Sequence, residues 1–188
     1  IEIPDGVTRI GENTFSMCEN LSSITLPESL TEIDSHAFLG CSALTSVILP
    51  DGLNSIGQEA FFNCTGLTSV SVPASVEEMG DNPFHGCSGI ESIVVDRGNK
   101  VFASPRNCNA IINTVTKTLV TGCSNTVIPK GVTMIGEGAF ISCRNLTSIK
   151  IPNGVTKIGQ DAFGLCRNLE KVVLPNSVTS IGESAFAD

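Results

Sequence analysis

Residues 44–64 read LTSVILPDGLNSIGQEAFFNC and decide the fold. The first seven residues follow the pattern Leu-x-x-Val-x-Leu-Pro, whose alternation is typical of a strand with one buried face. Proline donates no hydrogen bond to a ladder, so Pro50 marks the end of that strand. The next segment predicts a second short strand, and Gly57 after it suits a tight turn. Too few residues remain before Cys64 for a long helix, so we predict a single helical or 3-10 turn there.

The same pattern recurs along the 188-residue chain with a period of 23 residues. A fixed period of roughly 20–50 residues signals a repeat architecture. From Phe84 to Phe140 the spacing is 56 residues, so one unit, at about residues 96–128, is longer and irregular. Prolines lie at 4, 27, 50, 73, 129, 152 and 175, phenylalanines at 15, 38, 61, 84, 140, 163 and 186, and cysteines at 18, 41, 64, 87, 143 and 166.

One such unit cannot bury its own apolar face, whereas stacked units can. Stacking places equivalent residues above one another, so the central valines and isoleucines of the main strands predict one buried column. The phenylalanines predict a second column, in which each ring packs on the ring of the next coil. We therefore expect residues 1–188 to form a single solenoid of about eight coils, each rising roughly 4.8 Å. Neither end of the chain has the polar cap that solenoids use, which predicts a piece of a longer array.

These residues also carry a family resemblance. The 23-residue spacing of Leu-x-x-Leu-x-Leu resembles a leucine-rich repeat. The Leu-Pro that closes the strand, followed by Ile-Gly-x-x-Ala-Phe-x-x-Cys, resembles the BspA-like class of bacterial surface proteins over nearly the whole chain. The resemblance implies an α/β leucine-rich-repeat solenoid, a right-handed β-α superhelix of the horseshoe type, dominated by β-structure with short helical turns. It also implies a secreted or cell-surface location, and such relatives are associated with binding host extracellular-matrix proteins and with attachment between cells.

Two departures from a plain leucine-rich repeat lead to further structural predictions. Where the general pattern has Asn or Cys in the turn, this chain has Gly or Ser, so we expect hydroxyl and backbone groups to replace the usual asparagine ladder. Residues 107–123 resemble an insertion of this family, in which residues 110–115 and 118–122 predict a β-hairpin through Thr116 and Lys117. The turn positions are Gly6, Ser29, Gly52, Ser75, Gly131, Gly154 and Ser177.

The eight cysteines admit two interpretations. An even number is compatible with disulfides in a secreted chain. Six of them, however, share one position of the repeat, as buried small hydrophobic residues would. We favour buried free thiols for those six, and Cys108 with Cys123 is the pair best placed for a bridge. No Cys-x-x-Cys spacing is present, so the cysteines indicate no zinc site.

Nothing in the sequence points to catalysis. His36 and His85 lie at variable repeat positions, and neither belongs to a Gly-x-Ser-x-Gly or His-Glu-x-x-His motif. The glycines follow the repeat and form no phosphate-binding loop. We therefore predict no enzyme activity, no catalytic or metal-binding residues and no cofactor. A net charge of −8 disfavours nucleic acid as a partner. The chain has no run of 18 apolar residues, so we predict no membrane insertion.

The main strands predict a candidate binding surface. Between the buried positions, their outward residues should pave the concave face of the solenoid, which is rich in small hydroxyls with interspersed aliphatic residues. Solenoids often bind through such faces, although this one lacks aromatic anchors because the chain has no Trp or Tyr. The outward residues are Ser23, Thr25, Ser46, Ile48, Ser69, Ser71, Ser92, Val94, Asn125, Val127, Ser148, Lys150, Lys171 and Val173.

Charge divides the chain into two unlike halves. Residues 1–94 contain 13 acidic residues and one basic residue, a net charge of −12, whereas the remainder has a net charge of +4. Such asymmetry can orient a partner, or it can reflect solvated coil edges alone. We predict a non-enzymatic adhesion module that binds a protein, such as a host matrix protein, or a glycan. The alternative is a structural spacer that holds another domain away from the cell wall.

Overall fold

The structure, a computed structural model, describes residues 1–106 and 108–188 in full and Asn107 only as the last residue of a short 3-10 helix. Short strands separated by tight turns make up the chain. In the first half they are β1 (Arg9–Ile10), β2 (Glu32–Ile33), β3 (Ser55–Ile56), β4 (Ser69–Val72), β5 (Glu78–Met79) and β6 (Ser92–Val95). The irregular unit contains β7 (Phe102–Ala103), the 3-10 helix η1 (Pro105–Asn107), β8 (Ala110–Asn113) and β9 (Thr118–Gly122). The second half contains β10 (Met134–Ile135), β11 (Ser148–Lys150), β12 (Lys157–Ile158), β13 (Lys171–Val173) and β14 (Ser180–Ile181).

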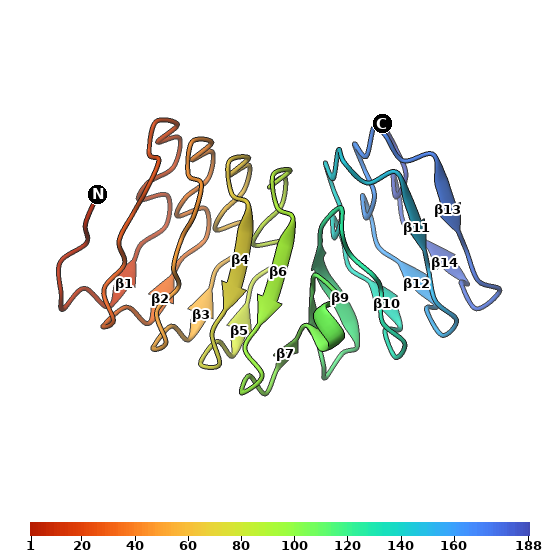
Figure 1. Cartoon of the computed structure of the whole chain (residues 1–188), viewed down its shortest axis with the longest axis horizontal. Helices are drawn as coiled ribbons and strands as arrows, with labels where there is room; N and C mark the ends of the chain where they lie inside the picture. The colour runs from red at the N-terminus through yellow and green to blue at the C-terminus, as the bar shows by residue number, and fades with distance from the viewer.

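The coils stack into an elongated β-solenoid of about seven turns (Figure 1). Equivalent residues of successive coils pair in parallel, as Arg9 pairs with Glu32. The second short strands form the sheet β1-β2-β3-β5 and, together with β7, β8 and β9 of the irregular unit, the sheet β14-β12-β10-β9-β8-β7. Among the main strands β4 pairs with β6 and β11 with β13. The predicted count of eight coils was one too high, because the irregular unit forms a hairpin where a regular coil would close.

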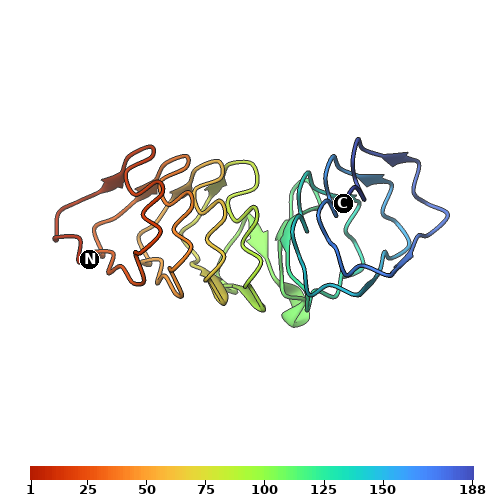
Figure 2. The same ribbon diagram turned by 90° about the horizontal axis from the view of Figure 1, so that it is seen from above.

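The predicted helical turns and the horseshoe shape were wrong. In the described residues η1 is the only helical element, and it lies outside the regular repeats. The residue two places before each column phenylalanine has a left-handed φ of 49° to 57°, which breaks a right-handed helical turn. The turn amides instead bond to the next coil, as Phe38 N donates to Ala60 O at 2.7 Å. With strand-like spacing on both sides of each coil, the coils of each half stack in a nearly straight run, and the two runs meet at an angle at the hairpin unit (Figure 2).

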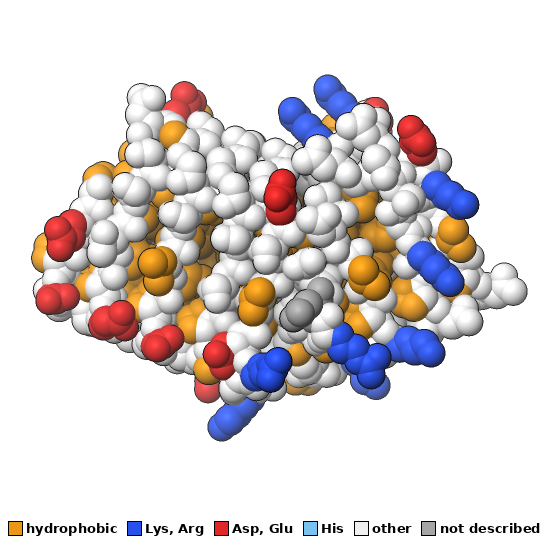
Figure 3. Space-filling model, viewed as in Figure 1, with side chains coloured by type: hydrophobic (Ala, Val, Ile, Leu, Met, Phe, Trp, Pro, Cys, Tyr) orange, Lys and Arg blue, Asp and Glu red, His pale blue; other side chains and the backbone are white. Residues whose placement is uncertain are grey.

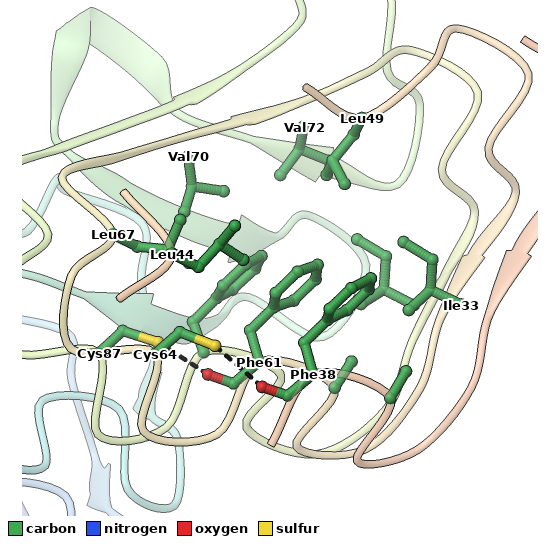
Figure 4. Packing of buried hydrophobic residues seen from close by; sticks show 14 of the residues in the cluster. Ile33, Phe38, Leu44, Leu49, Phe61, Cys64, Leu67, Val70, Val72 and Cys87 are labelled. Carbon is green, nitrogen blue, oxygen red and sulfur yellow. Dashed lines mark hydrogen bonds between the residues drawn. The ribbon is translucent and has the colours of Figure 1, made fainter. Parts of the chain in front are cut away.

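Phenylalanine rings form the predicted column in the core. Phe38 and Phe61 are fully buried and stack with their ring centroids 5.0 Å apart, and Phe140 and Phe163 stack at 4.9 Å. Figure 4 shows the rings of Phe38 and Phe61 between the main-strand side chains, such as Val70, and residues of the other sheet, such as Ile33. The same packing recurs in each regular coil, so the column is a repeated contact that joins neighbouring coils.

Serine hydroxyls take the place of the asparagine ladder, as expected. Ser29 Oγ accepts a bond from Gly6 N at 3.0 Å and donates to Val7 O at 2.9 Å. Ser177 repeats the arrangement with Gly154 N and Val155 O. Each hydroxyl therefore joins its own turn to that of the preceding coil.

The predicted hairpin is present and interrupts the stack. Strands β8 and β9 are antiparallel, and Asn113 Oδ1 accepts the amides of Val115 and Thr116 at the turn. The strand β7, which pairs antiparallel with β8, was not predicted. Ile111 packs into the hydrophobic cluster of the first half, whereas Ile112 packs into that of the second half. The hairpin therefore separates the apolar core into two clusters.

Candidate functional site

The outward residues of the main strands lie together on one surface, which we call the strand face (Figure 3). It consists of the fourteen residues predicted from the sequence, all of which are exposed except the half-buried Ser92. In β4 and β11 the exposed residues alternate with buried ones, because side chains of a strand point to opposite sides in turn. The strands pair in register, so these residues form two lines that run across the coils.

The first line is a file of small hydroxyl groups in the first half of the chain. Ser23 pairs with Ser46, and Ser69 pairs with Ser92. None of these four side chains donates or accepts a hydrogen bond within the described protein, so their hydroxyls are free to bond to water or to a partner. Beyond the hairpin the same line continues with Ser148 paired to Lys171.

The second line contains all four exposed aliphatic residues of the strand face. Ile48 is 85% exposed, Val127 71%, Val94 47% and Val173 41%. Isolated surface aliphatics are ordinary, but these four occupy one repeat position on one face. Ser71 separates Ile48 from Val94 in this line, and Lys150 pairs directly with Val173. The strand face therefore offers apolar contacts at intervals within a weakly polar surface.

Charge is unevenly distributed over this face. Figure 3 shows acidic side chains gathered towards the N-terminal end and basic side chains towards the C-terminal end. Lys150 and Lys171 form no ion pair with any described residue, so both remain available to an acidic group. The opposite sheet differs, because Arg9 there is held by Asp34 at 2.7 Å and by Glu32 at 3.5 Å.

One feature of the strand face was not predicted. Between β6 and the segment 125–128 lies the stretch that contains η1, where Ser104 Oγ donates to Ile93 O and Val127 N donates to Cys108 O. Asn125, predicted as an outward residue of the candidate binding face, is exposed and donates its side-chain amide to Glu91 O at 3.2 Å. Pro105 breaks the repeat pattern, yet nothing in the sequence says that its segment returns to this face.

The cysteines are free thiols, seven buried and Cys18 half-buried. In four coils the thiol donates to the carbonyl of a phenylalanine in the preceding coil, as Cys64 Sγ does to Phe38 O at 3.1 Å (Figure 4). Burial raises the pKa of Cys166 to about 11 and that of Cys143 still further. Thiols with raised pKa values, such as those of Cys143 and Cys166, are therefore neutral inside the stack. The buried-thiol interpretation is confirmed for five of the six repeat cysteines, and the sixth, Cys18, is free but half-buried. The bridge between Cys108 and Cys123 is not formed.

The two histidines share one carboxylate, which the sequence did not reveal. His36 Nε2 lies 3.2 Å from Glu59 Oε2, and His85 Nδ1 lies 3.6 Å from Glu59 Oε1. Phe62 packs edge-on against the ring of His85. In the described residues no hydroxyl or thiol bonds to either ring, and no group of three or more His, Cys, Asp and Glu residues is arranged to hold a metal ion.

The half-buried His85 predicts a loss of stability in acid. Burial lowers the pKa of His85 below its usual 6.5, although the charges of Glu59, Asp161 and Glu137 oppose this. The unfolded chain therefore binds a proton more readily, so the His85 contribution to the free energy of unfolding should fall as the pH drops below about 6.5. Urea titrations between pH 7 and pH 5 should show a smaller loss for His85→Asn than for the wild type. His36→Asn is the control, and an equal loss in the wild type and His85→Asn would contradict this prediction.

Comparisons with known proteins place the chain among bacterial repeat proteins. A family model described as a BspA type leucine rich repeat region matches residues 1–112 and 113–188. A leucine rich cell surface protein of Faecalibacterium prausnitzii is 27% identical with a TM-score of 0.71, and the match covers 98% of this chain and 55% of that one. A leucine-rich repeat protein of Eubacterium ventriosum is 24% identical with a TM-score of 0.79, covering 96% of this chain and 55% of that one. The pneumococcal vaccine antigen PcpA is 21% identical with a TM-score of 0.71, covering 96% and 57%.

The chain thus spans just over half the length of each of these three proteins. At 24% and 21% identity the last two show a shared fold alone. A search of curated proteins finds no match. No helix in the part of the chain that the structure describes is long and apolar enough to cross a membrane.

Proposed function

Because this chain belongs to the BspA-type leucine-rich-repeat family, we propose that it is a non-enzymatic adhesion module that binds a protein of a host or neighbouring cell through the strand face. The line of exposed aliphatic residues on that face carries the proposal. Ile48, Val94 and Val127 leave apolar surface in water, and a partner that covers it gains roughly 25 cal/mol for each Å² buried. The free serine hydroxyls beside this line can bond to the partner's polar groups.

The remaining surface supports binding without catalysis. Seven of the eight cysteine thiols are buried, and both histidines face the carboxylate of Glu59. A location outside the cell is supported by the likeness to the Faecalibacterium cell surface protein. Without Trp or Tyr the face has no strong anchor. We therefore expect modest affinity for one copy, which several copies on a cell would increase through avidity.

A double substitution distinguishes adhesion from a purely structural spacer. Ile48→Glu with Val94→Glu places two charges where the proposed partner would bury apolar surface, so binding should weaken roughly tenfold or more. Both side chains are exposed, so the fold should persist. The assay measures binding of the purified chain to matrix laid down by cultured mammalian cells, with a glycan array run beside it.

Val115→Glu is the matched control, because this exposed aliphatic residue lies at the hairpin tip, away from the strand face. Far-UV circular dichroism and thermal midpoints check that all variants remain folded. A spacer predicts that wild type and double variant behave alike in every binding assay. Loss of binding to glycans alone would assign the strand face to a sugar partner and refute the protein partner.

A further inference from the structure

The hairpin unit opens a groove on the side of the solenoid opposite the strand face. Strand β5 pairs only with β3, and the neighbouring six-stranded sheet begins at β7 (Figure 1). In regular coils the carbonyl of the last residue of such a strand accepts an amide of the next coil, as Ile56 O of β3 accepts a hydrogen bond from Gly80 N at 2.8 Å. No strand of the described chain pairs with the second edge of β5. The interruption therefore leaves β5 as an open edge at the end of the sheet β1-β2-β3-β5.

Beside this edge lies a groove of about 510 Å³. Its apolar lining comes from Met79 of β5, Phe102 of β7, Val120 of β9 and Met134 of β10. The polar lining includes hydroxyls and amides of the hairpin. Met79, Val120 and Met134 are only partly buried, so their side chains are accessible from the groove. Methionine side chains are flexible and adapt to the shape of a ligand.

The charged groups that line the groove are both acidic. Asp81 lies on the β5 side and Glu137 on the β10 side, and both are exposed. Neither forms an ion pair with a described residue, and no lysine or arginine lines the groove. An aliphatic surface flanked by two carboxylates complements a side chain with an apolar stem and a cationic head, which is the chemistry of lysine and arginine.

We propose that this groove binds an extended, basic peptide segment of a protein partner. The lysine or arginine stems lie on the two methionines, and their charged heads pair with Asp81 and Glu137. The backbone amides of the segment bond to the open edge of β5, as in strand addition to other exposed sheet edges. The hydrogen bonds to β5 distinguish a peptide from a free polyamine, which offers charge without a peptide backbone. The site is separate from the strand face and does not depend on the function proposed for that face.

Methionine methyl NMR tests the proposal directly. The chain has three methionines, of which Met79 and Met134 line the groove, whereas Met17 lies near the N-terminus and acts as an internal reference. An octapeptide of alternating valine and lysine is added to chain labelled with ¹³C at the methionine methyls. We expect saturable shifts for Met79 and Met134 and none for Met17. The same-length valine–glutamate peptide and spermine are the comparison ligands.

Charge removal provides the second arm of the test. Asp81→Asn with Glu137→Gln keeps shape and polarity but removes both charges, so the dissociation constant for the valine–lysine peptide should rise roughly three- to tenfold. Glu12→Gln with Glu183→Gln, two exposed acids outside the groove, should leave it unchanged. Any one of four results would overturn the proposal. These are a shift at Met17 equal to those at Met79 and Met134, binding of the acidic peptide or of spermine as tight as that of the valine–lysine peptide, or an unchanged affinity in the Asp81→Asn and Glu137→Gln variant.

Discussion

Phe61→Ala is expected to lower the free energy of unfolding by roughly 3–5 kcal/mol. Phe61 is fully buried and stacks on Phe38 at 5.0 Å and on Phe84 at 5.2 Å, so its truncation removes two ring contacts and leaves a cavity between coils. A repeat stack is stabilised mainly by contacts between neighbouring coils, so this loss weakens two interfaces at once. Urea unfolding followed by far-UV circular dichroism measures it, since the chain contains no Trp or Tyr for fluorescence.

Two controls separate the ring column from ordinary volume loss. Phe61→Leu keeps most of the buried volume and should cost distinctly less. Phe186→Ala removes a ring that is 39% exposed and stacks only on Phe163, so it should also cost less than the central truncation. If Phe61→Ala were no more destabilising than Phe186→Ala, the column would not hold the coils together as described.

The second large effect is expected at the hairpin. A Cβ added at Gly122 of β9 would lie 2.5 Å from Cζ and 2.8 Å from Cδ1 of the Phe140 ring, which is fully buried. Gly122→Ala should therefore destabilise the chain by roughly 1–3 kcal/mol, the usual cost of overfilling a packed core. The same urea titration measures this cost.

Gly11→Ala is the control for the glycine change itself, because its added Cβ would meet Thr14 Oγ1 at an ordinary contact distance of 3.5 Å. Combining Gly122→Ala with Phe140→Leu should cost less than the sum of the two single changes, since the smaller side chain relieves the clash. Strict additivity would show that Gly122 and Phe140 do not pack against each other.

The repeat pattern alone predicted most of the fold. Periodic residues such as Phe61 and Cys64 must occupy equivalent places in each coil, so their columns and the buried thiols followed directly from the spacing. The hairpin also followed from local signals, because its two apolar runs flank Thr116 and Lys117. The strand face followed from the same alternation, and thirteen of its fourteen residues are exposed while Ser92 is half-buried.

Other features depend on contacts that periodicity does not encode. The left-handed turn position holds Asn13, Glu59 and Ser184 in different coils, so no residue type marked the turn as non-helical. Because the regular coils contain no helices, the predicted horseshoe curvature of the stack lost its physical basis. The contact of His36 and His85 with Glu59 joins two different repeat positions in neighbouring coils. The open edge of β5 depends on where the inserted strands pair.

Binding of a macromolecule to the strand face can be measured by titration. Wild type, the Ile48→Glu and Val94→Glu double variant, and Val115→Glu are each titrated onto cell-derived matrix, and the dissociation constants are compared. We predict a ratio to wild type of roughly ten or more for the double variant and near one for Val115→Glu, with all three chains folded. A ratio near one for both, or an equal loss in both, would contradict the proposal.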